Sequence, residues 1–403
     1  MAKKNKIEEL AIFGGASQFT TPKPTSNLVR PDFEGFLAYS KKIFHQNQYT
    51  DDGSLVRLLE QRLANFHQTE FCVAFCSGFW ALALAISALA RKGKDEVILP
   101  ALTYRRMADV VAWTGLKPHF CEVDPSTLAN SAATVAPCIN EKTALILGVH
   151  PIVNCCDVEG LVELAQKRNI PLLFDSVESV YELFAGRKVG YFGHAEIFSL
   201  GASKLVNGFE GGYLTTNDAA LAAQLALTRN SGCNGADNVV VAGSMNARLN
   251  VIHAAMALAS LDDLDSQIYR NHLRYNTYKR LLGSLAEIRL LEFDENTRPG
   301  YKNILLELLD GWPLTRDDTI RILNAEKVLA RAYYPQPLHR KKMVYCHVAA
   351  DLPVTERLSE RFILPPCGHF VSDDDIARIV ELLSFIFTHA EAINDRLRMN
   401  GVM

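Results

Sequence analysis

The stretch from residue 171 to residue 212 constrains this chain most, because two short apolar runs in it each end close to a reactive side chain. The first run, Pro171 to Phe174, stops abruptly at Asp175, which is typical of a buried parallel strand that presents a carboxylate at its carboxyl end. The second run, Ala195 to Leu200, is followed by small residues and then by Lys204. The stretch therefore places one acid and one lysine beyond the ends of two strands.

An acid and a lysine in these positions fit the chemistry of pyridoxal 5'-phosphate (PLP). The lysine amine forms a Schiff base with the cofactor aldehyde, and the aspartate keeps the pyridine nitrogen protonated so that the ring acts as an electron sink. A crowded, partly desolvated pocket lowers the pKa of such a lysine and frees its amine to react. The alternative is that Asp175 caps a helix and Lys204 is a solvated loop lysine, because strands often end in aspartate.

Four motifs follow one another around these residues: D-S-V-E-S from 175, G-R-K-V-G from 186, F-S-x-x-x-S-K from 198 and F-E-G-G-Y-L-T-T-N-D from 209. Their order resembles the DegT/DnrJ/EryC1/StrS family of sugar aminotransferases. The resemblance runs from about Tyr49 to about Leu264, and more loosely to the C-terminus. It implies a fold type I PLP enzyme that acts on nucleotide-linked keto sugars, with Lys204 and Asp175 as its catalytic residues.

Strand-like and helix-like segments alternate along the chain, which favours a mostly parallel sheet covered on both faces. A long helical region, interrupted near Ser266, then leads into a second group of strands and helices. The predicted strands are 71–75, 96–99, 117–123, 143–149, 288–293 and 303–309, and the predicted helices are 55–66, 78–91, 105–113, 158–168, 249–282, 319–323 and 373–386.

The expected fold class is therefore α/β, and the resemblance implies the PLP-dependent transferase fold type I, which is aspartate aminotransferase-like. We expect a large domain with a mixed, mostly parallel seven-stranded sheet and a smaller α/β C-terminal domain. The expected boundaries are an N-terminal arm over 1–50, a large PLP-binding domain over 51–265 and a small C-terminal domain over 266–403. The arm is expected to lie over the body of the protein or over a partner subunit.

The resemblance also implies which residues form the cofactor pocket. Ser77-Gly78-Phe79 matches the phosphate cradle at a strand–helix junction, where backbone N–H groups and the helix dipole attract an anion. Phe79 replaces the family's threonine, so only its backbone donor remains. Tyr104 matches the aromatic residue that stacks on the pyridine ring. The alternative is that Tyr104 is simply a core residue. The other matches are Glu178 beside the ring oxygen, Ser199 on the phosphate, and Asn246, which the family donates to the other subunit's phosphate.

A second set of matches is expected to border the substrate. It consists of His150, Arg248, Arg331, Tyr334 and His339. His150 ends a predicted strand, and a lone histidine there is about as often structural. Arg105 and Arg106 stand where the family usually has small or apolar residues, and they either contact an anionic part of the substrate or are merely solvated. If the Asn246 match holds, the active site is composite and the protein is at least a homodimer.

Composition excludes several other classes of protein. The net charge of −3 gives no indication of nucleic-acid or membrane-surface binding. No apolar stretch of signal-peptide length follows the short basic start, and no run approaches the length of a membrane span. The nine cysteines contain no CxxC pair, so we expect reduced cysteines in a cytoplasmic protein. The histidines show no zinc-binding spacing, and no metal is expected.

The expected reaction is a transamination with pyridoxamine 5'-phosphate as the aminated form of the cofactor. The resemblance implies L-glutamate as amino donor and, as acceptor, the 4-keto or 3-keto group of a nucleotide-linked 6-deoxyhexose. A keto-cyclitol such as scyllo-inosose remains an alternative acceptor, and a non-catalytic binding or regulatory scaffold remains an alternative role. Lys204 argues against the family's dehydratases, which carry histidine there. A nicotinamide enzyme is disfavoured because the G-x-G-x-x-G fingerprint is missing.

Overall fold

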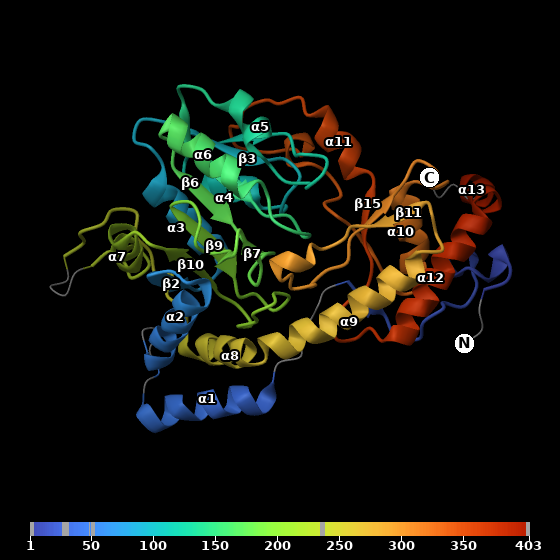
Figure 1. Cartoon of the computed structure of the whole chain (residues 1–403), viewed down its shortest axis with the longest axis horizontal. Helices are drawn as coiled ribbons and strands as arrows, with labels where there is room; N and C mark the ends of the chain where they lie inside the picture. The colour runs from blue at the N-terminus through green and yellow to red at the C-terminus, as the bar shows by residue number, and fades with distance from the viewer. Residues whose placement is uncertain (1–3, 26–31, 48, 50–52, 234–237, 400–403) are drawn as a thin grey trace.

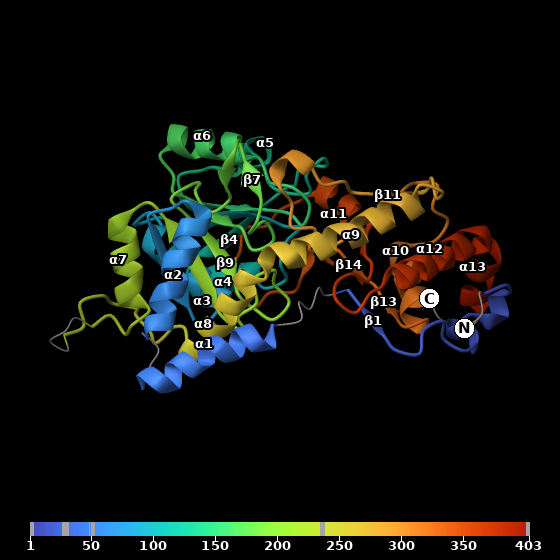
Figure 2. The ribbon, with the colours of Figure 1, turned by 60° about the horizontal axis from the view of Figure 1, so that its bottom comes forward.

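A computed structural model describes residues 4–25, 32–47, 49, 53–233 and 238–399. One end of the molecule holds a large sheet between layers of helices, and the other end holds a smaller sheet with its own helices (Figure 1). Helix α9 (Leu264–Leu282) runs from beneath the large sheet to the small one (Figures 1 and 2). One continuous helix therefore connects the two ends of the molecule.

The large sheet has seven strands in the order β2-β10-β9-β6-β5-β3-β4. Strand β10 is antiparallel to both of its neighbours, and all the other pairs are parallel. The predicted mixed, mostly parallel seven-stranded sheet of an α/β fold is thus confirmed. The strands are β2 (Phe71–Phe75), β3 (Glu96–Pro100), β4 (Lys117–Cys121), β5 (Thr143–Val149), β6 (Leu172–Asp175), β9 (Ala195–Ser199) and β10 (Gly212–Thr216).

Helices cover both faces of this sheet because its strands are apolar on both sides. Leu173 of β6 belongs to a buried cluster with three helices, whereas Phe174 belongs to a cluster with α6 on the other face, as the alternation of side chains along a strand requires. The helices of the first face are α3 (Gly78–Leu89), α4 (Met107–Trp113) and α7 (Ala219–Thr228), and those of the second include α2 (Ser54–His67), α6 (Val158–Arg168) and α8 (Val251–Asp262).

The small sheet has four antiparallel strands in the order β11-β12-β15-β14. Residues 338–359 leave this end and pack on the large sheet, where the backbone N–H of Val348 donates to the Pro118 carbonyl of β4 at 2.9 Å. The elements are β11 (Ile288–Leu290), β12 (Leu306–Leu308), α10 (Arg316–Ala325), β13 (Val328–Leu329), β14 (Arg331–Ala332), α11 (Pro353–Ser359), β15 (Phe362–Leu364), α12 (Asp373–Thr388) and α13 (Ala390–Met399).

The N-terminal segment lies along the small end of the molecule. Strand β1 (Lys23–Pro24) pairs in parallel with β13, and the buried carboxylate of Glu326 accepts from the backbone N–H groups of Ala11 and Gln18 at 2.7 and 2.6 Å. Helix α1 (Phe33–Gln46) packs against α8 instead. The arm is therefore an integral part of the body of this chain.

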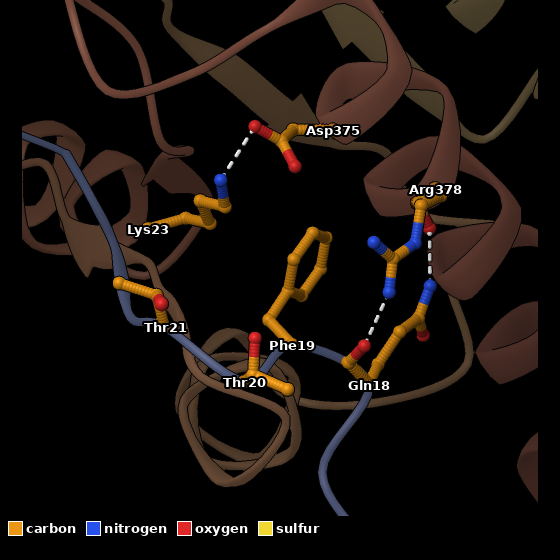
Figure 3. A pocket seen from close by; sticks show the side chains of 7 residues that line it. All are labelled: Gln18, Phe19, Thr20, Thr21, Lys23, Asp375 and Arg378. Atoms are coloured by element: carbon orange, nitrogen blue, oxygen red, sulfur yellow. Dashed lines mark hydrogen bonds and ion pairs between the residues drawn. The ribbon is translucent and has the colours of Figure 1, made fainter. Parts of the chain in front are cut away.

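A cavity of about 310 Å³ remains between this segment and α12 (Figure 3). Its charged groups already have partners within the chain. Lys23 is ion-paired with Asp375 at 2.6 Å, and the Arg378 guanidinium donates to the Gln18 carbonyl. The cavity therefore lies where the arm meets the small end of the molecule, and Figure 3 shows its lining side chains.

Several elements differ from the sequence predictions at their ends. Helix α4 begins at Met107 rather than Arg105, and the long helix breaks at Asp263 rather than near Ser266. The predicted strand 303–309 forms only over Leu306–Leu308. The irregular backbone before β12 turns instead toward the large sheet, which has consequences for the site described next. The predicted domain boundary at 265 falls inside the continuous helix α9 and stays a prediction.

Candidate active site

Asp175 and Lys204 meet at the carboxyl end of the large sheet. Asp175 ends β6, which pairs in parallel with β9, where Asp175 lies opposite Ile197. Lys204 follows β9 after a tight turn in which its backbone N–H donates to the Gly201 carbonyl at 2.9 Å. Because neighbouring parallel strands end at the same edge, the two side chains reach the same site.

Glu178 lies at the centre of a buried cluster of charges. The Lys204 Nζ lies 2.8 Å from its Oε1, and the Lys302 Nζ lies 2.6 Å from its Oε2. The Asn303 amide donates to Oε2 at 3.3 Å. Burial acts to raise the pKa of Glu178, but the two ammonium groups outweigh it and hold that pKa well below its usual range. Glu178 is therefore ionised at neutral pH.

The two lysines respond to this cluster in opposite ways. Burial acts to lower the pKa of Lys204, but the Glu178 carboxylate outweighs it, and the net pKa lies above the ordinary lysine value. Burial lowers the pKa of Lys302 to about 8 even though Glu178 opposes it, and the Lys204 charge adds to the lowering. One carboxylate thus serves two amines that differ in basicity.

Asp175 sits in a drier environment than Glu178. It is 8% exposed, and its Oδ1 accepts from the Val177 backbone N–H at 3.2 Å. Burial raises the pKa of Asp175 to about 6, against the effects of that hydrogen bond and of the Lys204 charge. A carboxyl group in this state favours a cationic or proton-donating partner.

A tight junction between β2 and α3 borders the same edge. Ser77 caps α3 by accepting from the Trp80 backbone N–H at 3.3 Å. A Cβ on Gly78 would lie 3.1 Å from the Cβ of Ser199 at the end of β9. The Ser199 hydroxyl accepts from the Gly201 backbone N–H at 3.3 Å. Ser77, Gly78 and Ser199 therefore lie at one junction, while the Phe79 ring contacts Trp80 edge-on at 5.1 Å. Their predicted role in holding the cofactor phosphate stays a prediction.

Tyr104 is half exposed at the mouth of the site and lies close enough to Lys204 to influence its charge. An exposed ring beside the lysine is available to stack on a planar ligand. Arg106 is ion-paired with Asp109 on its own helix, and Arg105 is exposed on the surface. The Arg106 charge is therefore already balanced by Asp109. Arg105 is the one of these two arginines that stays a candidate for contact with an anionic part of the substrate.

The structure separates the five residues predicted to border the substrate. Tyr334 lies close to Glu178 and Asp175, and its ring packs on Tyr333 at 4.4 Å between centroids. Arg331 is exposed on β14. The His339 Nε2 lies 2.8 Å from a Glu356 carboxylate oxygen. Of these three, Tyr334 is brought to the charge cluster.

His150 and the 246–248 segment border the same sheet edge through their backbones, since the His150 N–H donates to the Asp175 carbonyl at 3.0 Å and the Ala247 carbonyl accepts from the Cys76 N–H at 2.8 Å. The His150 ring is buried on Phe174 at 5.5 Å, its Nδ1 accepts from the Cys156 backbone N–H, and burial lowers its pKa to about 3. Asn246 is exposed, and its Oδ1 accepts from Arg248 at 3.2 Å. These placements do not test the predicted substrate roles, which stay predictions.

Comparison with known proteins identifies the family to which this arrangement belongs. The model of the DegT/DnrJ/EryC1/StrS aminotransferase family matches residues 33–384, which is most of the chain. The chain belongs to the DegT/DnrJ/EryC1/StrS aminotransferase family. The predicted family is thus confirmed, and the chain is a PLP-dependent aminotransferase of fold type I.

Three relatives illustrate how this family member compares with others. GDP-perosamine synthase of Caulobacter vibrioides is 29% identical over 335 residues, which is 82% of this chain and 90% of the relative. The L-glutamine:2-deoxy-scyllo-inosose aminotransferase of Streptomyces fradiae is 30% identical over 393 residues, or 90% of each protein. The crystal structure of DesI in the presence of its TDP-sugar product has a TM-score of 0.91 and 31% identity, and covers 98% of this chain and 100% of that one.

The residues of this DegT/DnrJ/EryC1/StrS member fit PLP on two structural grounds. Lys204 and a buried acid stand at one sheet edge, which is the donor set that an aldehyde and a pyridine nitrogen require. The second ground is the tight β2–α3 junction, because Gly78 leaves room where a Cβ would crowd Ser199 and the 12-residue helix α3 points its N-terminus to the same place.

Lys302 and Asn303 are the contacts of this site that the sequence predictions missed. Both side chains reach Glu178 from the irregular segment before β12. The sequence shows only a lysine and an asparagine ahead of an apolar run, which is an ordinary strand entry. Their role depends on how the two ends of the molecule pack, and a local pattern carries no such information.

Two further observations concern membrane spans and metal sites. Among the residues that the structure describes, no helix is long and apolar enough to cross a membrane. Within the same residues, no group of three or more histidine, cysteine, aspartate or glutamate side chains is arranged to hold a metal ion.

Proposed function

We propose that this protein transfers an amino group from an amino acid to a keto group of a nucleotide-linked 6-deoxy sugar. The observation that carries the proposal is the Lys204 amine, buried 2.8 Å from the Glu178 carboxylate and close to Asp175. For the acceptor, the support is the similarity to DesI, which was crystallised with its TDP-sugar product and matches 98% of this chain.

The proposed roles of the site residues follow from their charges and positions. PLP, when bound, supplies an aldehyde for the lysine amine and a ring that withdraws electrons from the bond being broken. Asp175 would hold the protonated ring nitrogen, and a cationic partner there would offset the cost of burying its carboxylate. Lys204 moves protons as a general acid and base, and its Nζ is oriented by Glu178. Ser199 and the first turn of α3 hold the phosphate.

The amino donor and the acceptor require separate tests. The proposal takes L-glutamate as donor and pyridoxamine 5'-phosphate as the form that carries the nitrogen. A relative from Streptomyces fradiae is named for L-glutamine and for a keto-cyclitol, so both alternatives have a specific basis. Purified protein should be assayed with each donor against a 4-keto-6-deoxyhexose nucleotide and against scyllo-inosose. Faster turnover of the keto-cyclitol would contradict the proposed acceptor.

The proposal includes a homodimer with composite active sites. Its support is that Asn246, which the family resemblance assigns to the other subunit's phosphate, is exposed in this chain. Mixing inactive Lys204→Ala chains with inactive Asn246→Ala chains should restore part of the activity, because one of the two mixed sites is then intact. No recovery from a mixture that exchanges subunits would contradict the composite site.

A reducing, cytoplasmic location completes the proposal. Its support is that Cys155 and Cys156, although neighbours in the sequence, both occur as free thiols in the structure. Titration of free thiols in protein isolated under native conditions tests it. Recovery of stable disulfides would contradict it.

A further inference from the structure

A buried carboxyl group that the proposed mechanism does not use lies directly behind Asp175. Glu196 is fully buried on β9, where it pairs with Phe174 of β6. Its Oε2 accepts from the Ser176 hydroxyl, and its Oε1 accepts from the Phe192 backbone N–H at 2.7 Å. Glu196 therefore ties the turn that precedes β9 to the residue that directly follows Asp175.

Ser176 belongs to the turn that orients the Asp175 carboxyl group. The Oδ1 of Asp175 accepts from the Val177 backbone N–H at 3.2 Å, and Ser176 lies between these two residues. The Ser176 backbone N–H donates to the Ile197 carbonyl of β9 at 3.0 Å, and its carbonyl accepts from the Ser179 N–H at 3.1 Å. A shift of Ser176 would therefore move both the Asp175 carboxyl group and its backbone donor.

His150, which follows the third strand of this edge, lies on the far side of Glu196. Its Nδ1 accepts from the Cys156 backbone N–H at 3.2 Å, so the neutral ring carries its hydrogen on Nε2. That Nε2 lies 3.9 Å from the Glu196 Oε2, and neither side chain is exposed to solvent. The imidazole thus closes the space behind the Glu196 carboxyl group and restricts its movement.

The link between Glu196 and Ser176 does not depend on the protonation state of Glu196. A serine hydroxyl can donate to a carboxylate or accept from a carboxylic acid. Breaking the link would leave a fully buried polar group without its partner, which is costly in a site of low dielectric. The network therefore fixes the positions of its members.

We propose that Glu196 is a positioning residue for Asp175, which it holds through the Ser176 hydroxyl in the orientation that meets the ring nitrogen of the cofactor. The proposal rests on the proposed role of Asp175 as the partner of that nitrogen. A hydrogen bond between charged groups is strong only when donor and acceptor are well aligned. A turn that was free to shift would lose part of this interaction.

The test compares two ligands of the apoprotein by fluorescence titration. One is PLP, and the other is its benzene analogue, in which a C–H group replaces the ring nitrogen while the aldehyde and the phosphate remain. The native chain should prefer PLP by at least about tenfold in dissociation constant, and Asp175→Asn gives the ratio expected without this contact. Ser176→Ala should lower the preference by at least about fivefold.

The ratio separates positioning from general stability, because a merely structural role would weaken both ligands equally. Glu196→Met removes both acceptor oxygens at similar size and should lower the preference as Ser176→Ala does, which covers poor folding of either variant. Glu196→Gln can still form a hydrogen bond with the Ser176 hydroxyl and should keep most of the preference.

The matched control is Thr143→Val. It removes another fully buried hydroxyl, whose oxygen accepts from the Asn140 backbone N–H at 2.9 Å where β5 begins, at the other end of that strand from His150. This variant should lose stability in urea unfolding and keep the native ratio of dissociation constants.

Two outcomes would overturn the proposal, and they differ in what else they affect. A native chain that binds both ligands equally would contradict the role of Asp175 in the proposed function as well. A clear native preference that Ser176→Ala and Glu196→Met retain, or that Thr143→Val loses to the same extent, would overturn the role of Glu196 alone. Neither ligand is turned over in this experiment, so both outcomes are independent of the acceptor assays.

Discussion

Two buried glutamates of this protein hold distant parts of the chain together, but with different charge balances. Glu326 is fully buried and binds one lysine, Lys4, at 3.2 Å, together with two backbone N–H groups. Glu178 binds two lysines and one side-chain amide. The first cluster pairs one anion with one cation and is suited to anchoring the arm. The second places two ammonium groups on one carboxylate close to Asp175, and buried groups with strongly perturbed pKa values of this kind mark sites of proton chemistry.

The largest expected effect separates the chemical role of the second cluster from its structural one. Lys204→Ala should lower transamination by at least about 10⁴-fold, because the amine acts both as nucleophile and as general base. The free energy of unfolding should change little, since Lys302 remains as the partner of Glu178. Steady-state rates and urea unfolding of the same preparation measure both quantities. Retained activity would contradict the assignment of Lys204.

The balanced cluster should show the opposite pattern. Glu326→Gln leaves the buried Lys4 without a counter-charge, so the free energy of unfolding should fall by about 3–5 kcal/mol. Urea unfolding gives this value. The rate of the remaining folded enzyme should stay at its native value. A fall in that rate would show that the two clusters are coupled, contrary to the comparison.

Asp175 sharpens the comparison because its burial should destabilise the apoprotein at neutral pH. Its pKa is raised from the ordinary 3.8 to about 6 by burial, so between pH 4 and 6 the folded state binds more protons than the unfolded state. Stability attributable to this group is therefore full below pH 4 and is lost as the pH rises through 6, by about 3 kcal/mol in all. Asp175→Asn should be more stable than the native apoprotein at pH 7 by about that amount.

The measurement for this prediction is urea unfolding of both apoproteins at several pH values. The advantage of the Asp175→Asn variant should vanish near pH 4, where the native side chain is also neutral. An Asp175→Asn variant that is less stable than the native apoprotein at pH 7 would rule out a strained, buried carboxylate.

The smallest expected effect concerns the amide in the Glu178 cluster. Asn303 donates to Glu178 over a long 3.3 Å contact while two ammonium groups already satisfy the carboxylate. Asn303→Ala should therefore lower kcat/KM by no more than about fivefold, or about 1 kcal/mol, as steady-state kinetics will show. A loss of a hundredfold or more would mean that the amide, rather than the second lysine, orients Glu178.

The sequence predicted the large sheet and the residues around Asp175 and Lys204 because each of those signals is local. An apolar strand ending in aspartate and a small-residue turn before a lysine are complete within a few positions. Lys302 has no such signal. Its importance comes from the packing of the segment before β12 against the end of β6. The sequence predicted a strand from residue 303, whereas the backbone that makes this contact is irregular. His150 does have a local signal, since it follows a predicted strand, but that signal does not show that its ring is buried against Phe174.

The most direct test of the account is to identify which lysine binds the cofactor. The protein loaded with PLP should be reduced with borohydride, digested and mapped by mass spectrometry, so that the covalent link is fixed to its residue. The account predicts the pyridoxyl mass on Lys204 and an unmodified Lys302, although both amines lie on the same carboxylate. Finding the label on Lys302, or on neither lysine, would contradict it.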